Sequence, residues 1–247
     1  MTFTFLEAID CLNSSSNSQY LLFFAIIILL CLLEYKHFII NFIIKSVMIY
    51  YLCVLDFEAT CWKNSANKDQ MEIIEFPSVL YRIDEGEETI EFISEFHCYV
   101  RPTINPILSD FCTELTGITQ EMVNPAETFD IVYAKHIKWL QTNVPFGSVF
   151  LFATCGKWDL MTQLPREIKN KGLKKNKFYS KYINVKYELE NFYKAKVTSM
   201  PSMLRFLGLT LDGRHHSGKD DTRNIAKAML KMISDGLLYE NFSILKV

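Results

Sequence analysis

The sequence has no strong net charge, no CxxC pair of cysteines, no internal repeat and no low-complexity segment. Its 247 residues carry a formal charge of −2, with a pI near 6.2. This balance argues against a histone-like or arm-like binder of nucleic acids, although the acidic metal ligands of a nuclease can offset a local basic surface. With 49% hydrophobic and 22% charged residues, the chain can form a sizeable core, and its length fits one domain with an extension.

The seven cysteines are odd in number, and most of them lie inside apolar runs. We therefore expect buried, reduced thiols in a cytosolic compartment rather than a disulfide framework or a zinc site.

Residues 20–33 form an apolar run without a charged or amide side chain. This run is shorter than the roughly 20 residues that span a bilayer, but extension to residues 19–35 brings it near the lower limit, with a tyrosine at each interface. A cleaved signal peptide is disfavoured, because no basic segment precedes the run and no small-residue cleavage site follows it. Residues 1–45 are thus an N-terminal extension with a candidate transmembrane helix at about 19–35.

Three interpretations of this extension stay open: a single membrane anchor, a hydrophobic helix packed on the following domain, and a faulty chain start. If the segment spans a membrane, Lys36, His37 and Lys45 follow it, and the positive-inside rule places the C-terminal domain in the cytosol. Otherwise we expect a soluble protein of the cytoplasm or nucleus.

From residue 49 onward, the pattern predicts an α/β domain. The apolar run 49–56 is rich in strand-forming residues and ends in an acid, which is typical of a buried strand. Residues 71–83 and 89–100 flank an acidic turn and predict an antiparallel hairpin. A further short strand is expected at 148–153, and helices are expected at 110–115, 128–143, 158–171, 200–207 and 220–234. Three early strands followed by alternating helices and strands predict a mixed sheet covered by helices.

Four acids and a histidine follow these elements in a fixed order. Asp56 and Glu58 lie at i and i+2 where the first strand ends, so their carboxylates point to the same face. Like charges so close are costly unless a cation neutralises them, and hard oxygen ligands suit Mg²⁺ or Mn²⁺ rather than zinc. Asp159 follows the strand at 148–153, and His216 precedes Asp221 by five positions at the start of the last helix.

Each feature has a plain structural explanation when it is taken alone. An aspartate before a helix is usually an N-cap, and acids in the first turn are favoured by the helix dipole. Asp220 and His215 compete with Asp221 and His216 for the same roles. The order of the segments, rather than any one of them, indicates a metal site.

In these segments the chain resembles the DEDDh exonucleases of the ribonuclease H-like fold, and within them the enhanced-RNAi type that includes the 3′ exonuclease of histone mRNA. The matching segments are DFEATC (56–61), IIEFP (73–77), LSDFC (108–112), LTGITQ (115–120), GKWD (156–159) and GRHHSGKDDTRNIA (213–226). The resemblance covers about residues 49–238. It implies a DEDDh exonuclease domain at 49–240 with a mixed five-stranded sheet flanked by helices, preceded here by a hydrophobic N-terminal helix.

The resemblance implies hydrolysis of phosphodiester bonds from an RNA 3′ end, with release of nucleoside 5′-monophosphates. Two Mg²⁺ ions, for which Mn²⁺ could substitute, would lie about 4 Å apart on one phosphate and be held by Asp56, Glu58, Asp159 and Asp221. Glu58 and His216 would be catalytic, with the imidazole as general base for the attacking water. The terminal nucleotide would be bound by Phe57, Glu58, Ala59, Thr60, Leu115, Thr116 and His216. Contacts to the 2′-OH are how such a site could favour RNA.

Residues 166–196 are the basic part of the chain, with tyrosines between the lysines. Basic residues with aromatics can track a single strand, so Trp158, Lys174, Lys175 and Lys177 are candidate RNA contacts. The alternative is a solvated face with the tyrosines packed inward, and Trp158 beside a strand end can equally belong to the core.

The favoured function is a 3′-to-5′ exoribonuclease that acts on single-stranded or 3′-overhanging RNA. One rival is a DNA-directed DEDDh exonuclease, and the other is a catalytically silent, membrane-tethered scaffold that binds RNA on the same fold. The pairs at 76–77 (FP) and 158–159 (WD) favour the RNA-directed branch by resemblance, and the complete set of acids argues against the silent scaffold.

Overall fold

The computed structural model describes residues 26–36, 48–63 and 65–247, and the chain divides into two units between Met48 and Ile49. In the first unit, residues 26–36 form a helix whose apolar side chains are exposed. The rest of the predicted segment 19–35 lies outside the described residues. Among the residues that the structure describes, no helix has both the length and the apolar character that a membrane crossing requires.

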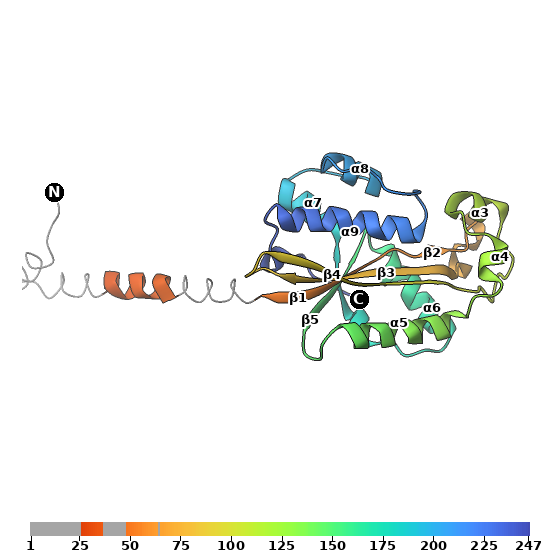
Figure 1. Ribbon diagram of the computed structural model, residues 1–247, viewed down its shortest axis with the longest axis horizontal. Coiled ribbons are helices and arrows are strands. Elements are labelled where there is room, and N and C mark those ends of the chain that lie inside the picture. The colour runs from red at the N-terminus through yellow and green to blue at the C-terminus, as the bar shows by residue number, and fades with distance from the viewer. Residues whose placement is uncertain (1–25, 37–47, 64) are drawn as a thin grey trace, which may run out of the picture. The chain divides into compact units, whose positions relative to one another are not determined.

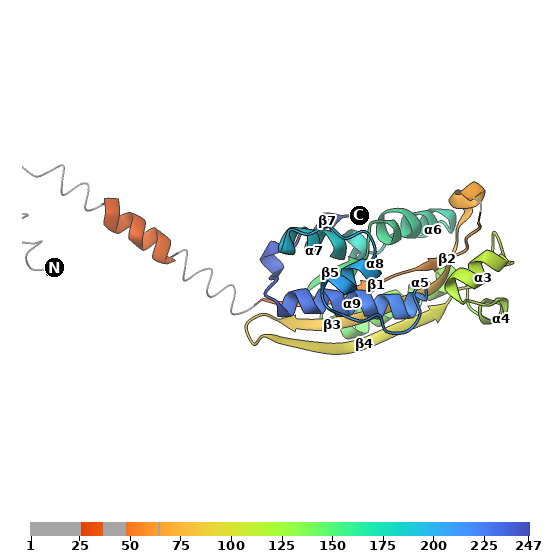
Figure 2. The same cartoon turned by 90° about the horizontal axis from the view of Figure 1, so that it is seen from above.

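The second unit is built on one mixed sheet, which has seven strands in the described residues (Figures 1 and 2). The spatial order is β2-β3-β1-β5-β6-β7, and β4 also pairs with β3. β1 is antiparallel to β3 and parallel to β5, so it lies in the interior of the sheet. The strands are β1 (Ile49–Leu55), β2 (Glu58–Ala59), β3 (Ile73–Asp84), β4 (Thr89–Tyr99), β5 (Val149–Thr154), β6 (Lys181–Asn184) and β7 (Leu245–Lys246).

The predicted mixed sheet is confirmed, but the predicted number of five strands is wrong. β2 and β7 have two residues each, which is too few for an alternating pattern to be recognised in the sequence. β6 has four residues and lies within the basic segment 166–196, where no apolar run marks it. The hairpin predicted at 71–83 and 89–100 is confirmed by the antiparallel pairing of β3 with β4.

Helices cover both faces of the sheet. α7, α8 and α9 lie on one face, α5 and α6 lie on the other, and α3 and α4 lie near the end of β2 (Figures 1 and 2). The α-helices are α3 (Asp110–Thr116), α4 (Gln120–Val123), α5 (Phe129–Asn143), α6 (Leu164–Asn170), α7 (Val185–Tyr193), α8 (Met200–Phe206) and α9 (Gly218–Ser234). The shorter helical turns are η2 (Ser65–Gln70), η3 (Asp159–Gln163), η4 (Lys177–Ser180) and η5 (Tyr239–Asn241).

The side chains of β1 alternate between the two faces of the sheet. Tyr51, Cys53 and Leu55 belong to the main core cluster, which also contains apolar side chains of α5 and α6. Because side chains alternate along a strand, the even-numbered residues point to the opposite face, where α9 packs on β1 and β3. Asp56 continues this even series at the end of the strand. The sheet therefore directs an acid toward the face that α9 covers.

Two predicted helices begin at different residues from those expected. The helix predicted at 158–171 opens with the π-helical turn η3, and α6 begins after it with a proline in its first turn. The last helix begins at Gly218, two residues before the predicted start. As a result, Asp159 and Asp221 each lie in the first turn of a helix.

Candidate functional site

Asp56 and Glu58 lie where β1 ends and β2 begins. Glu58 pairs with Glu75 of β3, and Asp56 comes directly after the last residue of β1. Phe57, between the two acids, is 4% exposed, and its ring centroid lies 4.6 Å from that of Phe76 in an edge-to-face contact. Burial of this ring fixes the short crossing from β1 to β2, residues 56–58, and leaves the two acids on the other side of the backbone.

Asp159 is attached directly to that crossing. Its Oδ1 accepts a hydrogen bond of 2.9 Å from the backbone N–H of Phe57, and the residue is 4% exposed. The contact follows from the topology, because β5 runs parallel to β1 and the chain leaves both strands at the same edge of the sheet. The third predicted acid is therefore brought to the first two.

Asp221 completes the group from α9. One carboxylate oxygen from each of Asp56, Glu58 and Asp221 lies within 4.8 Å of the other two. Asp221 is 4% exposed, and its backbone N–H donates to the carbonyl of Ser217 at 2.7 Å. The donor set consists of hard carboxylate oxygens, which suits a divalent cation such as Mg²⁺ or Mn²⁺.

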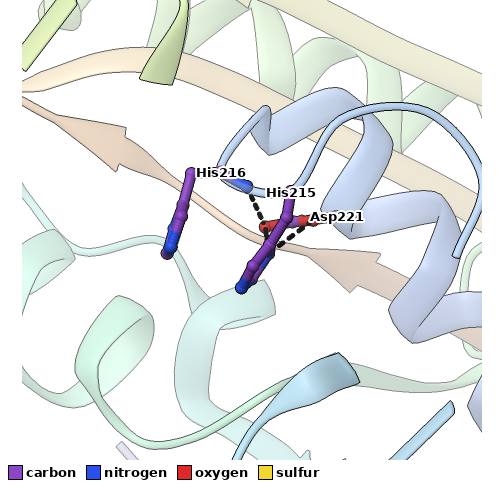
Figure 3. Close-up of side chains that lie close together, drawn as sticks. All are labelled: His215, His216 and Asp221. Atoms are coloured by element: carbon purple, nitrogen blue, oxygen red, sulfur yellow. Dashed lines mark hydrogen bonds and ion pairs between the residues drawn. The ribbon is translucent and has the colours of Figure 1, made fainter. Parts of the chain in front are cut away.

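The two histidines lie beside Asp221 (Figure 3). The backbone N–H of His216 donates to Oδ2 of Asp221 at 2.9 Å, and Nδ1 of His215 lies 3.0 Å from the same oxygen. The two imidazole rings stack, with centroids 3.9 Å apart and planes 19° from parallel. His216 is exposed and has φ of +65°, a left-handed conformation that few residues other than glycine adopt, although Asn, Asp and His adopt it more often than the rest.

Crowding and burial change how these groups hold protons. Burial raises the pKa of Asp56 well above its usual value, and the charge of Asp159 is the next largest cause. Burial and the charge of Glu75 raise the pKa of Glu58 to about 9, and burial raises the pKa of Asp159 to about 6. Without a cation, Glu58 therefore keeps its proton at neutral pH, and burial favours the protonated form of the other two acids as well. Burial, followed by the charge of His215, lowers the pKa of His216, which favours a neutral imidazole.

Sequence reasoning assigned no role to Glu75, although it lies in one of the quoted segments. Glu75 is 2% exposed and accepts the backbone N–H of Gly218 at 2.9 Å, at the start of α9. Its Oε1 also lies 2.7 Å from Nε2 of His97. A Cβ on Gly218 would lie 2.8 Å from Glu75 Oε2 and 3.0 Å from the carbonyl of Asp56. Glu75 therefore binds the start of α9, which carries Asp221, to β3. Gly218 makes this close approach possible because it has no side chain. A buried acid within an apolar strand was the available signal.

Apart from His216, the residues expected to bind a nucleotide lie on or beside β2 and at the end of α3. Ala59 is 5% exposed, and its carbonyl accepts from Cys112 Sγ of α3 at 3.7 Å, so the two segments are adjacent. The hydroxyl of Thr60 accepts the backbone N–H of Glu72 at 2.9 Å. The hydroxyl of Thr116 donates to the carbonyl of Cys112 at 2.8 Å, and Leu115 is partly exposed. Both threonine hydroxyls thus have partners within the fold.

The candidate RNA contacts are more scattered. Trp158 is partly buried and packs against the main core cluster. The Lys177 ammonium lies 5.7 Å from the ring centroid of Phe146, just before β5, whereas Asp159 follows β5. Lys175 donates to the carbonyl of Val247 at 2.7 Å, and Lys174 is exposed. The structure therefore places Lys177 at the opposite end of β5 from the acids.

The family model, the curated relatives and the solved structures that resemble this chain are all described as nucleases, exonucleases or exoribonucleases. A family described as Exonuclease (RNase_T) matches residues 53–229. The 3'-5' exoribonuclease 1 of Homo sapiens is 41% identical over 190 residues, which cover 75% of this chain and 53% of that protein. The crystallographic structure of the nuclease domain of 3'hExo, a DEDDh family member bound to rAMP, superposes with a TM-score of 0.69 at 41% identity and covers 75% of this chain and 92% of that one.

A second solved structure describes 3′-end-specific recognition of histone mRNA stem-loop by 3′-exonuclease. It superposes with a TM-score of 0.70 at 36% identity and covers 81% of this chain and 71% of that one. The chain spans between 29% and 54% of the length of the first curated relatives that it matches.

Proposed function

This chain belongs to the exonuclease family RNase_T, and on that premise we propose that it is a metal-dependent 3′-to-5′ exoribonuclease. The observation that carries the proposal is the convergence of acids from three separate elements. Carboxylates of Asp56, Glu58 and Asp221 lie within 4.8 Å of one another, and Asp159 is bound to the backbone between the first two. Similarity to exoribonucleases at about 40% identity supports RNA as the substrate class.

The residues present fit divalent cations. When they are ionised, acids that are buried together destabilise the fold unless positive charge compensates them, and the raised pKa values reflect this cost. We propose that two Mg²⁺ ions, or Mn²⁺ in their place, are held by Asp56, Glu58, Asp159 and Asp221. Bound cations would supply charge neutralisation and Lewis acidity at the scissile phosphate.

The protein's own groups position the substrate and move the proton. The His216 imidazole, neutral because its pKa is lowered, would accept the proton of the attacking water. Glu58 would be the second catalytic residue, because it would hold a metal ion and also lie against the terminal nucleotide. The backbone from Phe57 to Thr60, together with Leu115 and Thr116 of α3, would border the terminal nucleotide, and partly exposed Leu115 offers an apolar surface to its base or sugar.

The substrate class that we propose is single-stranded or 3′-overhanging RNA, and the products are nucleoside 5′-monophosphates. The solved relatives are described as bound to rAMP and as recognising the histone mRNA stem-loop, so the family site accepts ribonucleotides. Trp158, Lys174, Lys175 and Lys177 remain predicted contacts of the upstream strand.

The purified chain, in Mg²⁺, is expected to shorten a 5′-labelled RNA with a 3′-hydroxyl and to release 5′-monophosphates. A matched DNA strand should be degraded more slowly. Asp56→Asn should abolish shortening of both. Wild-type protein that binds this RNA but never shortens it in Mg²⁺ or Mn²⁺ would leave the silent RNA-binding scaffold as the function. Equal or faster degradation of DNA would favour the DNA-directed exonuclease.

The division into an N-terminal extension at 1–45 and a DEDDh exonuclease domain at 49–240 is also a proposal, as is membrane attachment through residues 19–35. Flotation of the full chain with phospholipid vesicles tests the attachment, with a chain that lacks residues 1–45 as control. Equal flotation of the two would exclude an anchor in this extension. In that case the domain is expected in the cytoplasm or nucleus without a tether.

A further inference from the structure

Arg214 joins the histidine loop to the end of α3. Its Nη2 donates to the carbonyl of Glu114, and it also donates to the carbonyl of Leu115 at 3.3 Å. These carbonyls belong to the last turn of a helix, where unpaired oxygens and the helix dipole favour a cation. A residue two positions before His216 in the sequence is thereby attached to a segment about one hundred positions earlier.

Gly117 provides the space that this contact needs. It ends α3 with φ of +78°, and a Cβ added there would lie 2.0 Å from Nη1 of Arg214. No real Cβ can approach a nitrogen so closely, so any side chain at position 117 would displace the guanidinium. Helix C-terminal glycines usually serve backbone conformation alone. Here the glycine also leaves room for a side chain from a distant loop.

The histidine loop, residues 213–217, is under backbone strain and depends on external contacts. His216 has φ of +65°, in the left-handed region that few residues other than glycine adopt. On one side, α9 holds the loop, since Asp220 accepts the backbone N–H of Arg214 at 2.9 Å and Asp221 accepts that of His216 at 2.9 Å. On the other side, the guanidinium of Arg214 holds it to α3.

We infer that Arg214 is a positioning residue that fixes the loop of His216 against the nucleotide-binding end of α3. Its backbone lies in the loop that carries the proposed general base. Its side chain donates to the carbonyl of Leu115, a residue proposed to border the terminal nucleotide. One side chain thus sets the distance between the base and the nucleotide. The inference rests on the proposed exonuclease function, because it assigns Arg214 a part in that same reaction.

Arg214→Ala should lower kcat on 3′-hydroxyl RNA by about tenfold to a hundredfold, since small misplacements of reacting groups cost this much. The dissociation constant for AMP in Mg²⁺ should rise as well, because the carbonyl of Leu115 loses the hydrogen bond from Arg214, and Leu115 is proposed to border the terminal nucleotide. Arg214→Lys should recover part of the loss, because its ammonium can reach one carbonyl but cannot reproduce the planar fork. Circular dichroism and the melting temperature of each variant separate misplacement from unfolding.

Gly117→Ala provides an independent route to the same displacement and should reproduce the fall in kcat. The double variant Gly117→Ala, Arg214→Ala should be no worse than the poorer single variant, because both changes break one contact. Gly147→Ala is the matched control. Gly147 has a similar φ of +85°, but no heavy atom lies within 4 Å of its added Cβ, so kcat should not change.

The inference would be overturned if kcat of Arg214→Ala stayed within about twofold of wild type, or if the losses in the double variant were additive. It would also be overturned if Arg214→Ala lowered the salt slope of RNA binding by about 0.7. The last would make Arg214 a phosphate contact instead. Failure of the proposed function is a separate outcome, because in that case wild-type protein itself would leave the RNA intact.

Discussion

The backbone N–H of Phe57 donates a 2.9 Å hydrogen bond to Oδ1 of Asp159, although 102 positions separate the two residues. The contact links the end of β1 to the first turn after β5. It gives Asp159 a structural role in addition to its proposed role as a metal ligand, and the two roles can be separated by mutation.

Asp159→Asn and Asp159→Ala should both abolish RNA shortening, but they should differ in stability. The asparagine oxygen can still accept from Phe57, whereas alanine leaves a buried N–H without a partner. Alanine should therefore be the less stable variant by about 1–3 kcal/mol. Urea unfolding in EDTA measures the difference. Equal stability of the two variants would mean that the Phe57 hydrogen bond contributes little.

Metal-free protein should lose stability as the pH rises. The pKa of Glu58 is raised to about 9 and that of Asp159 to about 6, while both groups titrate near 4 in an unfolded chain. Between these limits the folded state binds protons that the unfolded state has released, so the free energy of unfolding falls with rising pH. Saturating Mg²⁺ should reduce the fall, because cations bind the ionised acids more tightly at higher pH.

Melting temperatures between pH 5 and 9, in EDTA and in Mg²⁺, test this expectation. Glu58→Gln is the control, because it removes the group with the raised pKa of about 9 and should flatten the decline above pH 7. A melting temperature in EDTA that stays constant or rises over this range would contradict it.

His216→Asn is a better test of the general base than His216→Ala. Asparagine tolerates the left-handed backbone at φ of +65°, so the loop should keep its shape while the imidazole is lost. We expect kcat to fall by about 10²–10⁴-fold, with the Mg²⁺-induced rise in melting temperature retained. His215→Asn should have a much smaller effect on kcat. If the two variants lost activity in the reverse order, His215 would be the base.

The lysines at 174, 175 and 177 remain a predicted RNA track. If they contact phosphates, reversing all three to glutamate should lower the salt slope of single-stranded RNA binding by about 2, since each contact contributes about 0.7. Lys177 lies on Phe146 at the far end of β5 from Asp159, so only RNA that extends well beyond the terminal nucleotide should respond. Unchanged affinity and slope with long RNA would remove these lysines from the interface.

The acids could be selected from the sequence because the order of their segments along the chain resembles that of the DEDDh exonucleases, although each acid alone has a plain structural explanation. Asp56 and Glu58 end an apolar run, and Asp221 lies in the first turn of an amphipathic helix with a histidine five positions before it. The hairpin of β3 and β4 was predictable from a local signal, since two strand-like runs flank an acidic turn.

The features that sequence reasoning missed depend on contacts between distant segments. β6 is a strand because β5 and β7 pair with it, although its four residues lie in a basic segment. Glu75 and Arg214 gain their roles from Gly218 and from the α3 carbonyls, which lie 143 and about 100 positions away. Propensity and periodicity report on neighbours in sequence, so they contain no information about such partners.

The separation in sequence between Asp56 and α9 also has a consequence for synthesis. Asp56 is made early, but its partner Asp221 follows 165 positions later, and β1 cannot acquire its parallel neighbour until β5 has been made. A nascent chain that ends before residue 221 therefore lacks one of the four proposed ligands, however well its first strands have formed.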